Sequence, residues 1–472
     1  MPGLLPGMAS LLYVALVVAT IIVVVTDNRN PVKTLAWLLV LIFVPLAGLV
    51  LFFFFGRTNR KEKLISNHGL NRLMKRPMED FQRQESLQQQ AAGDIKMKFF
   101  ENVNRALPFE GNKVRPMTNG TDFVISLLSD IYRAVDHIHL EFFKFEDDPA
   151  GRLLRDALFD AASRGVKVKV IYDDVGCWQV PGRFFEEMLE RGIEVRGFLK
   201  VRFPLFTSKV NYRNHRKIVV IDGLTGYTGG MNIAVRYLRG VDWGRWRDTM
   251  IRLEGRAVYG LQTVFLTDWY AMDRALYDNP EYFPSAGSPG KAIVQIVTSA
   301  PIGDGRDYMQ GLLLAITNAR NYFYIQTPYF LPADPIRLAL KTIAMAGVDV
   351  KIMIPERADT ILTHYASCSF LDDMMSSGVK FYFYTEGFIH AKMVVSDDNF
   401  AVIGSTNIDF RSLEHNFEVN AVMYDKESAL MCRDIFQRDM KSCRAAEISQ
   451  WKERPRARKI AESLMRLLSP LL

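Results

Sequence analysis

Cysteine is scarce in this sequence of 472 residues. The four cysteines are scattered, and they stand at Cys177, Cys368, Cys432 and Cys443. No two of them form a C-x-x-C pair, so both a disulfide framework and a thiolate zinc site are disfavoured. The cysteine pattern fits a protein of a reducing compartment.

Charge is missing from two long stretches near the N-terminus. Residues 1–26 contain no charged side chain, and neither do residues 34–55, which follow the polar turn DNRNPVK. Each run approaches the roughly 20 apolar residues that a membrane-spanning helix needs. The first run also lacks the basic start and the small-residue cleavage site of a signal peptide. The sequence therefore predicts a two-helix transmembrane hairpin over residues 1–56.

Cations gather just beyond this predicted hairpin, where the only acid is Glu62. They are Arg57, Arg60, Lys61, Lys63, Arg72, Lys75 and Arg76. By the positive-inside rule, this asymmetry predicts that the bulk of the chain lies on the cytoplasmic side, next to anionic headgroups. The whole chain is mildly basic, with a net charge of +7. That charge suits an anionic partner such as phospholipid or nucleic acid, without choosing between them.

The remainder of the chain shows an internal repeat. Residues 57–108 are polar, basic and rich in glutamine, which predicts a tether. Beyond them, strand and helix patterns alternate, and the same order of patterns occurs twice. We therefore expect an α/β fold with two duplicated domains, each a mixed sheet flanked by helices. Pro and Gly cluster at 279–291, so the predicted segments are domains at 109–285 and 286–448 and a basic amphipathic tail at 449–472.

One motif stands in both repeats, as NHRKIVVIDGLTGYTGGMN (214–232) and IHAKMVVSDDNFAVIGSTN (389–407). Aligned on their histidines, the two copies match at four positions with polar or charged side chains. The matched pairs are His215 and His390, Lys217 and Lys392, Asp222 and Asp397, and Asn232 and Asn407. A single His-x-Lys on a strand is usually a surface pair, but two copies in matched contexts indicate a shared chemical function.

The spacing within the motif points to chemistry on phosphate. Alternate residues of a strand share a face, so each histidine projects beside its lysine. Lysine is a compact cation that suits a phosphate oxygen, and histidine serves as a nucleophile or as an acid and base near neutral pH. Two such sets can face each other across one phosphodiester. One histidine then attacks phosphorus while the other protonates the leaving oxygen, and no metal ion or cofactor is required.

The doubled H-x-K motif with its following aspartate resembles the phospholipase D superfamily. The segments NRNPVKTLAW and TPYFLP, together with the first motif, resemble the bacterial cardiolipin synthases, and the resemblance covers nearly the whole chain. It implies that the phosphatidyl group of one phosphatidylglycerol is transferred to another, giving cardiolipin and glycerol through a phosphatidyl-histidine intermediate. It also implies a multi-pass protein of the bacterial inner membrane with its catalytic domains on the cytoplasmic side.

The resemblance also suggests roles for the motif residues. His215 and His390 become the nucleophile and acid–base pair, and family habit makes His215 the one that is phosphatidylated. Nothing in the residues themselves distinguishes the two histidines. Lys217 and Lys392 become phosphate ligands. The other members are Asp222 and Asp397 as braces of the fold, and Asn232, Asn407 and Ser405 as donors to the substrate.

Two further carboxylates follow the motifs, Asp248 in WRDTM and Glu418 in NFEVN. We expect each to orient an imidazole through its second ring nitrogen. His137 and His139 share one strand face, but no third ligand of suitable spacing is nearby, so we expect a structural role for them.

Two amphipathic segments allow more than one interpretation. Residues 199–214 interleave aromatic and basic side chains, and they suit either a solvated loop or a lip that dips into a membrane. In the tail, an apolar helical stripe stands beside several arginines and is formed by Ile460, Leu464, Leu467 and Leu468. This stripe suits an interfacial contact with a membrane, or packing against the chain's own domain or a partner.

The sequence leaves rival functions open. A hydrolytic phospholipase D, or a transferase that uses another alcohol, would share the same motifs. A nuclease of the superfamily fits the basic charge, but the predicted hairpin is a poor address for nucleic acid. A non-enzymatic scaffold is disfavoured because both histidines and both lysines are intact. The oligomeric state is not indicated by any pattern.

Overall fold

The computed structural model describes residues 4–27, 31–52, 63–200, 212–302 and 307–469. The chain forms two compact units, which are treated separately below. One comprises residues 1–62 and 201–212, and the other comprises residues 63–200 and 213–472.

The first unit contains the two hydrophobic runs. The first run forms α1 (Leu4–Asp27), and the second forms α2 (Pro31–Phe43) and α3 (Pro45–Leu51). The expected single second helix is interrupted at Val44, because Pro45 lacks the N–H that would continue the helical hydrogen bonds and disfavours a helical residue before it. A small apolar cluster includes Val24, Leu41 and Phe52.

Within the described part of the chain, no helix combines the length and the apolar character that crossing a membrane requires.

The second unit is built on a mixed sheet that contains sixteen strands in the described residues. Its first half has seven strands in spatial order: β4 (Glu194–Phe198), β3 (Lys167–Asp173), β2 (His137–Phe142), β6 (Lys217–Ile221), β7 (Thr225–Gly229), β9 (Met250–Glu254) and β1 (Pro108–Met117). The second half repeats this order with β13 (Lys380–Tyr384), β12 (Asp349–Pro355), β11 (Tyr322–Gln326), β15 (Met393–Ser396), β16 (Phe400–Gly404), β17 (Asn416–Met423) and β10 (Ala292–Ser299). The short β18 (Cys443–Ala445) pairs with β13 at the far edge.

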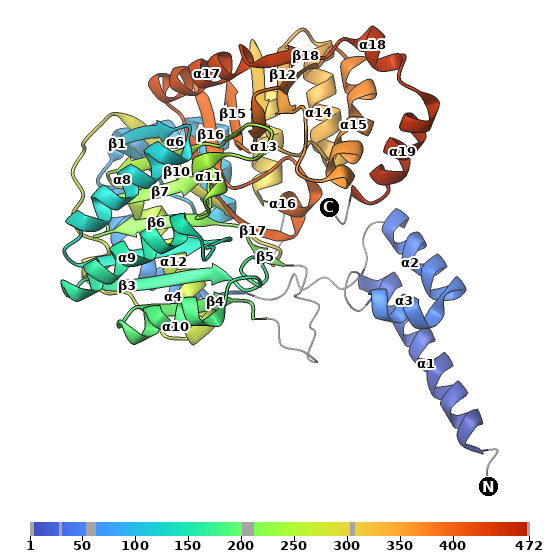
Figure 1. Ribbon diagram of the computed structural model, residues 1–472, viewed down its shortest axis with the longest axis horizontal. Helices are drawn as coiled ribbons and strands as arrows, with labels where there is room; N and C mark the ends of the chain where they lie inside the picture. Colours follow the sequence, from blue (N-terminus) through green and yellow to red (C-terminus); the bar gives the residue numbers. More distant parts are fainter. Residues whose placement is uncertain (1–3, 28–30, 53–62, 201–211, 303–306, 470–472) are drawn as a thin grey trace. The chain divides into compact units, whose positions relative to one another are not determined.

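Strand directions repeat as well as strand order. In both halves the three outer strands, β2 to β4 and β11 to β13, are mutually parallel, and the others pair antiparallel. The halves join where β1 pairs antiparallel with β10. The predicted α/β fold with a duplicated mixed-sheet domain is therefore confirmed (Figure 1).

Helices flank both halves of the sheet. The first half carries α8 (Gly120–Arg133), α9 (Pro149–Ser163), α10 (Gly182–Glu190), α11 (Arg236–Arg239) and α12 (Val258–Asp273). The second half carries α13 (Asp307–Asn318), α14 (Asp334–Met345), α15 (Ile361–Met375), α16 (Phe410–Glu414) and α17 (Lys426–Met440). A 3-10 turn, η3 (Pro280–Tyr282), lies in the connection between them.

The alternation along β2 shows why helices are needed on both faces. Ile138 and Leu140 point into the core that α8 and α9 complete. His137 and His139 point the other way, where both rings lie within hydrogen-bonding reach of Gln262 of α12. Because successive strand residues face opposite sides, every central strand needs apolar cover on both. The two histidines pack inside the fold, as their sequence context predicts.

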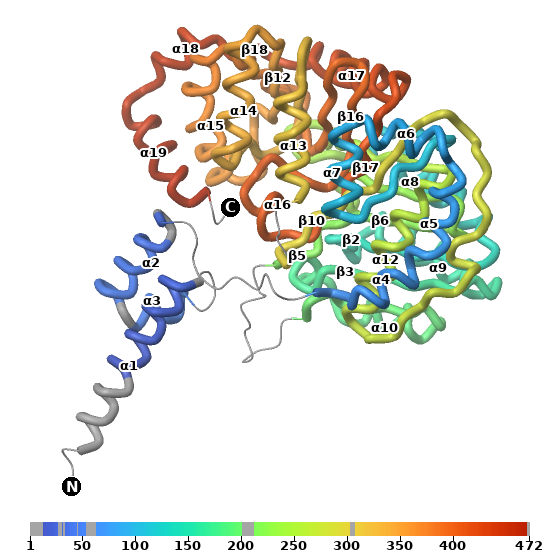
Figure 2. The backbone as a smooth tube through the Cα atoms, turned by 180° about the vertical axis from the view of Figure 1, so that it is seen from behind, coloured from blue at the N-terminus to red at the C-terminus, as the bar shows by residue number. Residues whose placement is uncertain are grey.

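The predicted tether over 57–108 needs correction. Residues 67–104 form four helices of the second unit, which Figure 2 shows from behind: α4 (Asn67–Leu73), α5 (Lys75–Gln82), α6 (Glu85–Gly93) and α7 (Ile95–Asn104). Phe81, Leu87 and Phe100 are buried, and α7 packs against α13 and β10. The glutamine-rich composition hides these few apolar residues, whose burial outweighs the cost of ordering the segment.

The C-terminal tail also folds against the second half of the sheet and its helices. It forms α18 (Ile448–Lys452) and α19 (Arg456–Arg466), and both helices pack on α15. Trp451 stacks on Phe383 of β13, with the ring centroids 5.6 Å apart. The amphipathic tail predicted from the sequence is therefore helical and docked on the second half.

Candidate active site

The two motif histidines are positioned by short strands that join the two halves. β5 (Arg213–Asn214) immediately precedes His215 and pairs parallel with β17 of the second half. β14 (Gly387–Ile389) precedes His390 and pairs parallel with β8 (Arg245–Arg247) of the first half. The backbone N–H of His215 donates to Phe417 O at 2.9 Å, and that of His390 donates to Arg247 O at 2.7 Å. Each histidine is therefore fixed by the opposite half of the protein.

The same crossed arrangement supplies a carboxylate to each imidazole. Both oxygens of Glu418 lie 3.0 Å from Nδ1 of His215, and Asp248 Oδ2 lies 2.7 Å from Nδ1 of His390. Both carboxylates are buried. A carboxylate that accepts the Nδ1–H holds the neutral tautomer in which Nε2 carries the lone pair. Asp248 and Glu418 thus lie where a carboxylate that orients an imidazole must lie.

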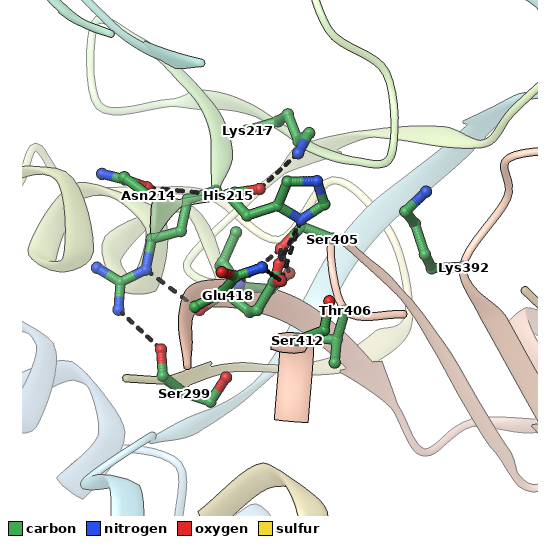
Figure 3. A network of polar contacts seen from close by, with 12 residues as sticks. Asn214, His215, Lys217, Ser299, Lys392, Ser405, Thr406, Ser412 and Glu418 are labelled. Atoms are coloured by element: carbon green, nitrogen blue, oxygen red, sulfur yellow. Dashed lines mark hydrogen bonds and ion pairs between the residues drawn. The ribbon is translucent and has the colours of Figure 1, made fainter. Parts of the chain in front are cut away.

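The two lysines lie beside the histidines and are buried. Nζ of Lys217 donates to the carbonyl of His215, and Nζ of Lys392 donates to that of His390. Both amino groups act electrostatically on the His215 ring, and Figure 3 shows the three side chains together. Residues from both halves therefore meet in one electrostatically coupled cluster.

Burial controls the charges of this cluster. It lowers the pKa of Lys217 to about 7 and that of Lys392 to about 8, against the pull of Glu418 and Asp248. Burial likewise lowers the pKa of His215 to about 4 and that of His390 to about 3, and the neighbouring lysines add to the effect. An incoming phosphodiester carries the opposite charge and favours the protonated forms. Both imidazoles are therefore neutral at neutral pH, and a bound anion favours the charged forms of the lysines and of a histidine that acts as acid.

The motif aspartates lie at the other end of their strands. The carboxylate of Asp222 accepts the backbone N–H groups of Val135, Asp136 and His137. In the second half, the carboxylate of Asp397 likewise accepts the backbone N–H groups of Arg320, Asn321 and Tyr322. Both aspartates have a positive φ, 52° and 51°. Each aspartate ties the turn after its own strand to the start of the neighbouring strand, β2 or β11. Neither aspartate is brought to the histidines.

The residues expected to donate to the substrate have different surroundings. Asn232 accepts from the backbone N–H of Lys144 and donates to the hydroxyl of Tyr237, so its amide is engaged inside the protein. Asn407 is buried, and its Oδ1 has no hydrogen-bond partner among the described residues. Ser405 Oγ donates to Glu418 Oε2 at 2.5 Å and is fully buried. Its contact is with the carboxylate that orients His215.

An arginine network behind His215 was not anticipated from the sequence. Arg216, which stands between His215 and Lys217, donates to the main-chain oxygen of Glu418 and to the carboxylate of Asp268. Asn214 donates to Glu141, whose pKa is raised well above its usual value by burial and by Asp268. These contacts fix the backbone beneath Glu418. The sequence signal was weak, because Arg216 stands in the polar run between His215 and Lys217 and outside the apolar strand that follows.

An aromatic wall around His390 was also missed. The rings of Trp246, Phe388 and Tyr237 lie 5.3, 5.8 and 6.3 Å from the imidazole of His390, measured between centroids. On the other side, Phe143 lies 5.2 Å from His215. Aromatic rings exclude water, which explains the low pKa values of the two imidazoles.

The segment 199–214 cannot be assessed as a lip, because residues 201–211 lie outside the described residues.

Comparison with known proteins places this fold and site in a class. A family model described as "Cardiolipin synthase, PLD-like domain" matches residues 127–269 and 312–440, one match in each half. A model described as "Phospholipase_D-nuclease N-terminal" matches residues 15–57. The crystal structure of a phosphatidylserine synthase from Haemophilus influenzae Rd KW20 superposes with a TM-score of 0.60. It covers 80% of this chain and 100% of that one at 15% identity, so it shows the phospholipase D-like fold.

Curated relatives narrow the class. The chain is 39% identical to the major cardiolipin synthase ClsA of Bacillus subtilis (strain 168), over 98% of both chains. It is 38% identical to cardiolipin synthase 1 of Staphylococcus aureus (strain COL), over 97% of this chain and 95% of that one. The chain therefore belongs to the cardiolipin synthase family of the phospholipase D superfamily. This family membership identifies the chain as an enzyme of phospholipid synthesis that is associated with membranes.

Proposed function

We propose that this protein is a cardiolipin synthase that transfers the phosphatidyl group of one phosphatidylglycerol to a second. The observation that carries the proposal is the pair of histidine–carboxylate contacts, each formed across the two halves and each accompanied by a buried lysine. This arrangement provides a nucleophile, an acid and two cations around one phosphodiester. The two relatives named above are cardiolipin synthases, and the chain matches both over nearly their whole length.

In the first step, Nε2 of His215 attacks phosphorus of a bound phosphatidylglycerol. The bond from phosphorus to the headgroup oxygen breaks, and protonated His390 donates its Nε2 proton to that oxygen. Glycerol leaves, and a phosphatidyl group remains on His215. Lys217 and Lys392 stabilise the charge on the phosphoryl oxygens, and Glu418 stabilises the charge that develops on His215.

In the second step, His390 accepts the proton of a free hydroxyl on a second phosphatidylglycerol. The oxygen of that hydroxyl attacks phosphorus, and the bond to His215 breaks. Cardiolipin is released and both histidines return to their starting states. The aromatic rings beside the two histidines limit water, which favours the lipid acceptor over hydrolysis.

A product assay tests this proposal. The full-length protein is incubated in detergent with labelled phosphatidylglycerol as the only lipid, and the products are separated by mass. We expect cardiolipin and glycerol in equal amounts. Phosphatidic acid without cardiolipin would instead assign a hydrolytic phospholipase D. A mixed ester formed only with an added alcohol would assign a different acceptor.

We also propose that the N-terminal unit anchors the enzyme as a hairpin in the bacterial inner membrane, with both catalytic halves on the cytoplasmic side. Support comes from the two charge-free runs, from the cations that follow them and from the family match over residues 15–57. Reporter fusions at the C-terminus test the orientation. A fused green fluorescent protein should fluoresce and a fused alkaline phosphatase should be inactive. The reverse pattern would overturn the orientation.

A further inference from the structure

The C-terminal helix α19 carries its apolar stripe on the outside. Ile460, Leu464 and Leu467 are 61%, 54% and 74% exposed. They share one face of the helix, because they stand at spacings of four and three residues. In a soluble protein, such a stripe normally faces the core.

The opposite face of α19 is held down by an ion network. Glu462 is 1% exposed, and its carboxylate accepts from Arg454 at 2.6 Å and from Arg458 at 3.1 Å. Arg454 in turn lies 3.9 Å over the ring of Trp451, which stacks on Phe383 of the sheet. Turning the helix to bury its leucines would break a buried salt bridge, which is strongly unfavourable. The outward direction of the stripe is therefore fixed by the fold.

The first turn of α15 extends this apolar surface. Its residues Ile361 and Leu362 are 76% and 44% exposed, and α19 packs alongside α15 (Figures 1 and 2). We call the five apolar side chains together the α15–α19 surface: Ile361, Leu362, Ile460, Leu464 and Leu467. Exposed aliphatic residues gathered on two helices that pack together indicate an interaction surface more often than single scattered ones do.

This surface begins near the active site. Asp359, two residues before α15, accepts a hydrogen bond from the hydroxyl of Tyr329. The ring of Tyr329 lies 6.5 Å from that of Phe388, which in turn lies 5.8 Å from the ring of His390. A short chain of contacts thus connects the catalytic histidine of the second half to the first turn of α15.

Cations border the apolar stripe. Arg456 and Arg466 are exposed, and Lys459 is partly exposed. On the helical wheel, all three fall on the same side of the leucines. Aliphatic residues beside arginine and lysine are the composition of helices that lie in the interface of an anionic bilayer.

We propose that the α15–α19 surface docks on the face of an anionic phospholipid bilayer and holds the active site close to the membrane. The cations favour this occupant, because arginine and lysine beside an aliphatic stripe complement the negative charge of anionic lipid headgroups. The role in catalysis rests on the proposed function, since an enzyme acting on phosphatidylglycerol must receive headgroups from a bilayer. The docking itself does not depend on which lipid product is made.

A depth measurement tests the docking directly. A spin label is attached to Leu464→Cys, and for comparison to Ile125→Cys, whose side chain on α8 is 63% exposed. Cys443→Ser is introduced in both, because the other three cysteines are buried. The full-length protein is reconstituted in phosphatidylglycerol vesicles, and collisions of the label with oxygen and with a water-soluble nickel complex are measured. We expect the label at 464 to favour oxygen and the label at 125 to favour nickel.

Two results would overturn the proposal. If the label at 464 is as accessible to nickel as the label at 125, the surface faces water. If it is immobile and reached by neither reagent, protein covers it, either another part of the chain or a second copy. Vesicles of phosphatidylcholine should give a shallower label at 464, and equal depth in both lipids would contradict the role assigned to the cations.

An activity measurement separates docking from chemistry. Leu464→Glu combined with Leu467→Glu should lower turnover on phosphatidylglycerol vesicles about tenfold, because the charged side chains oppose contact with the bilayer. The same variant should match the wild type on short-chain phosphatidylglycerol dissolved as monomers. The matched control Ile125→Glu should change neither rate. Equal losses on both substrates would overturn the proposal, whereas inactivity of the wild type on both would count against the proposed function alone.

Discussion

The two halves of the second unit share one fold, but the surroundings of their motif histidines differ. Glu418, which contacts His215, accepts from Ser405 and from Asn416, and its main chain is held by Arg216. Arg247 likewise donates to the main-chain oxygen of Asp248, which contacts His390, but no serine or asparagine among the described residues donates to the Asp248 carboxylate. Its Oδ1 accepts the backbone N–H of Thr249. The more extensively braced carboxylate therefore belongs to His215.

The difference can be traced to single aligned positions. Where the second half has Ser405, the first has Gly230, and a Cβ there would lie 2.1 Å from Asp248 Oδ1. Where the first motif has Arg216, the second has Ala391. His390 also has Lys392 Nζ at 2.9 Å from its Nδ1, so a cation competes with the carboxylate beside it. The comparison shows that a duplicated scaffold braces the carboxylate beside His215 more extensively than the carboxylate beside His390.

The largest effect should come from removing either histidine. His215→Ala and His390→Ala should each lower turnover at least about 10⁴-fold, because nucleophile and acid act as a unit. The two are distinguished by trapping. Wild-type enzyme quenched during turnover of phosphorus-labelled lipid should carry the label on the peptide that contains residue 215. Label on the peptide with residue 390 would exchange the two roles.

The carboxylates should follow. Glu418→Gln and Asp248→Asn should each lower kcat about 10³-fold with little change in KM, because the amide no longer stabilises the charged imidazole. Steady-state kinetics on phosphatidylglycerol in detergent measure both constants, and circular dichroism checks that each variant folds. A loss of less than twofold in either variant would show that its carboxylate does not orient the histidine beside it.

The aligned Gly230 and Ser405 should give intermediate effects. Gly230→Ala should lower turnover about 10²-fold, because the new methyl group displaces Asp248 from His390. Ser405→Gly makes the second half resemble the first, and it should cost about tenfold through the lost hydrogen bond to Glu418. Turnover of the two variants, measured side by side, checks this order. A larger loss from Ser405→Gly than from Gly230→Ala would contradict it.

The smallest effect concerns stability and pH. Burial lowers the pKa of Lys217 from 10.5 to about 7 in the folded protein. Between these values the unfolded chain binds the extra proton, so the free energy of unfolding should increase as pH rises through this window. Lys217→Met removes this contribution and should raise Tm by about 2–4 °C at pH 7. Thermal unfolding in detergent measures both proteins, and the gain should shrink by pH 9. A gain that does not shrink would refute the assignment to Lys217.

The doubled motif was enough to predict the fold of the catalytic body. The spacing between His215 and Asn232 is repeated between His390 and Asn407, and strand and helix patterns alternate in the same order around both, so local periodicity indicated a duplicated mixed-sheet domain. The crossing of Glu418 and Asp248 was beyond the sequence, because it depends on β5 and β14 pairing with strands of the opposite half. Long-range pairings of this kind leave no periodic signal.

Average composition is a poor guide to two segments of the chain. The glutamine-rich composition of residues 57–108 predicts a tether, but the sparse apolar residues of this segment, such as Phe81 and Phe100, are buried in helices. The stripe of α19 allows a core-facing or a membrane-facing interpretation, and only the burial of Glu462 fixes its direction. In both cases average polarity was less informative than the positions of a few side chains.

The central claim is that His215 and His390 act on one phosphodiester. The most direct measurement is an experimental structure of the full-length protein with tungstate, an anion that mimics phosphate. We expect a single tungstate within hydrogen-bonding distance of Nε2 of both histidines and of Nζ of both lysines. Two separate tungstate ions, each bound by one histidine, would contradict it.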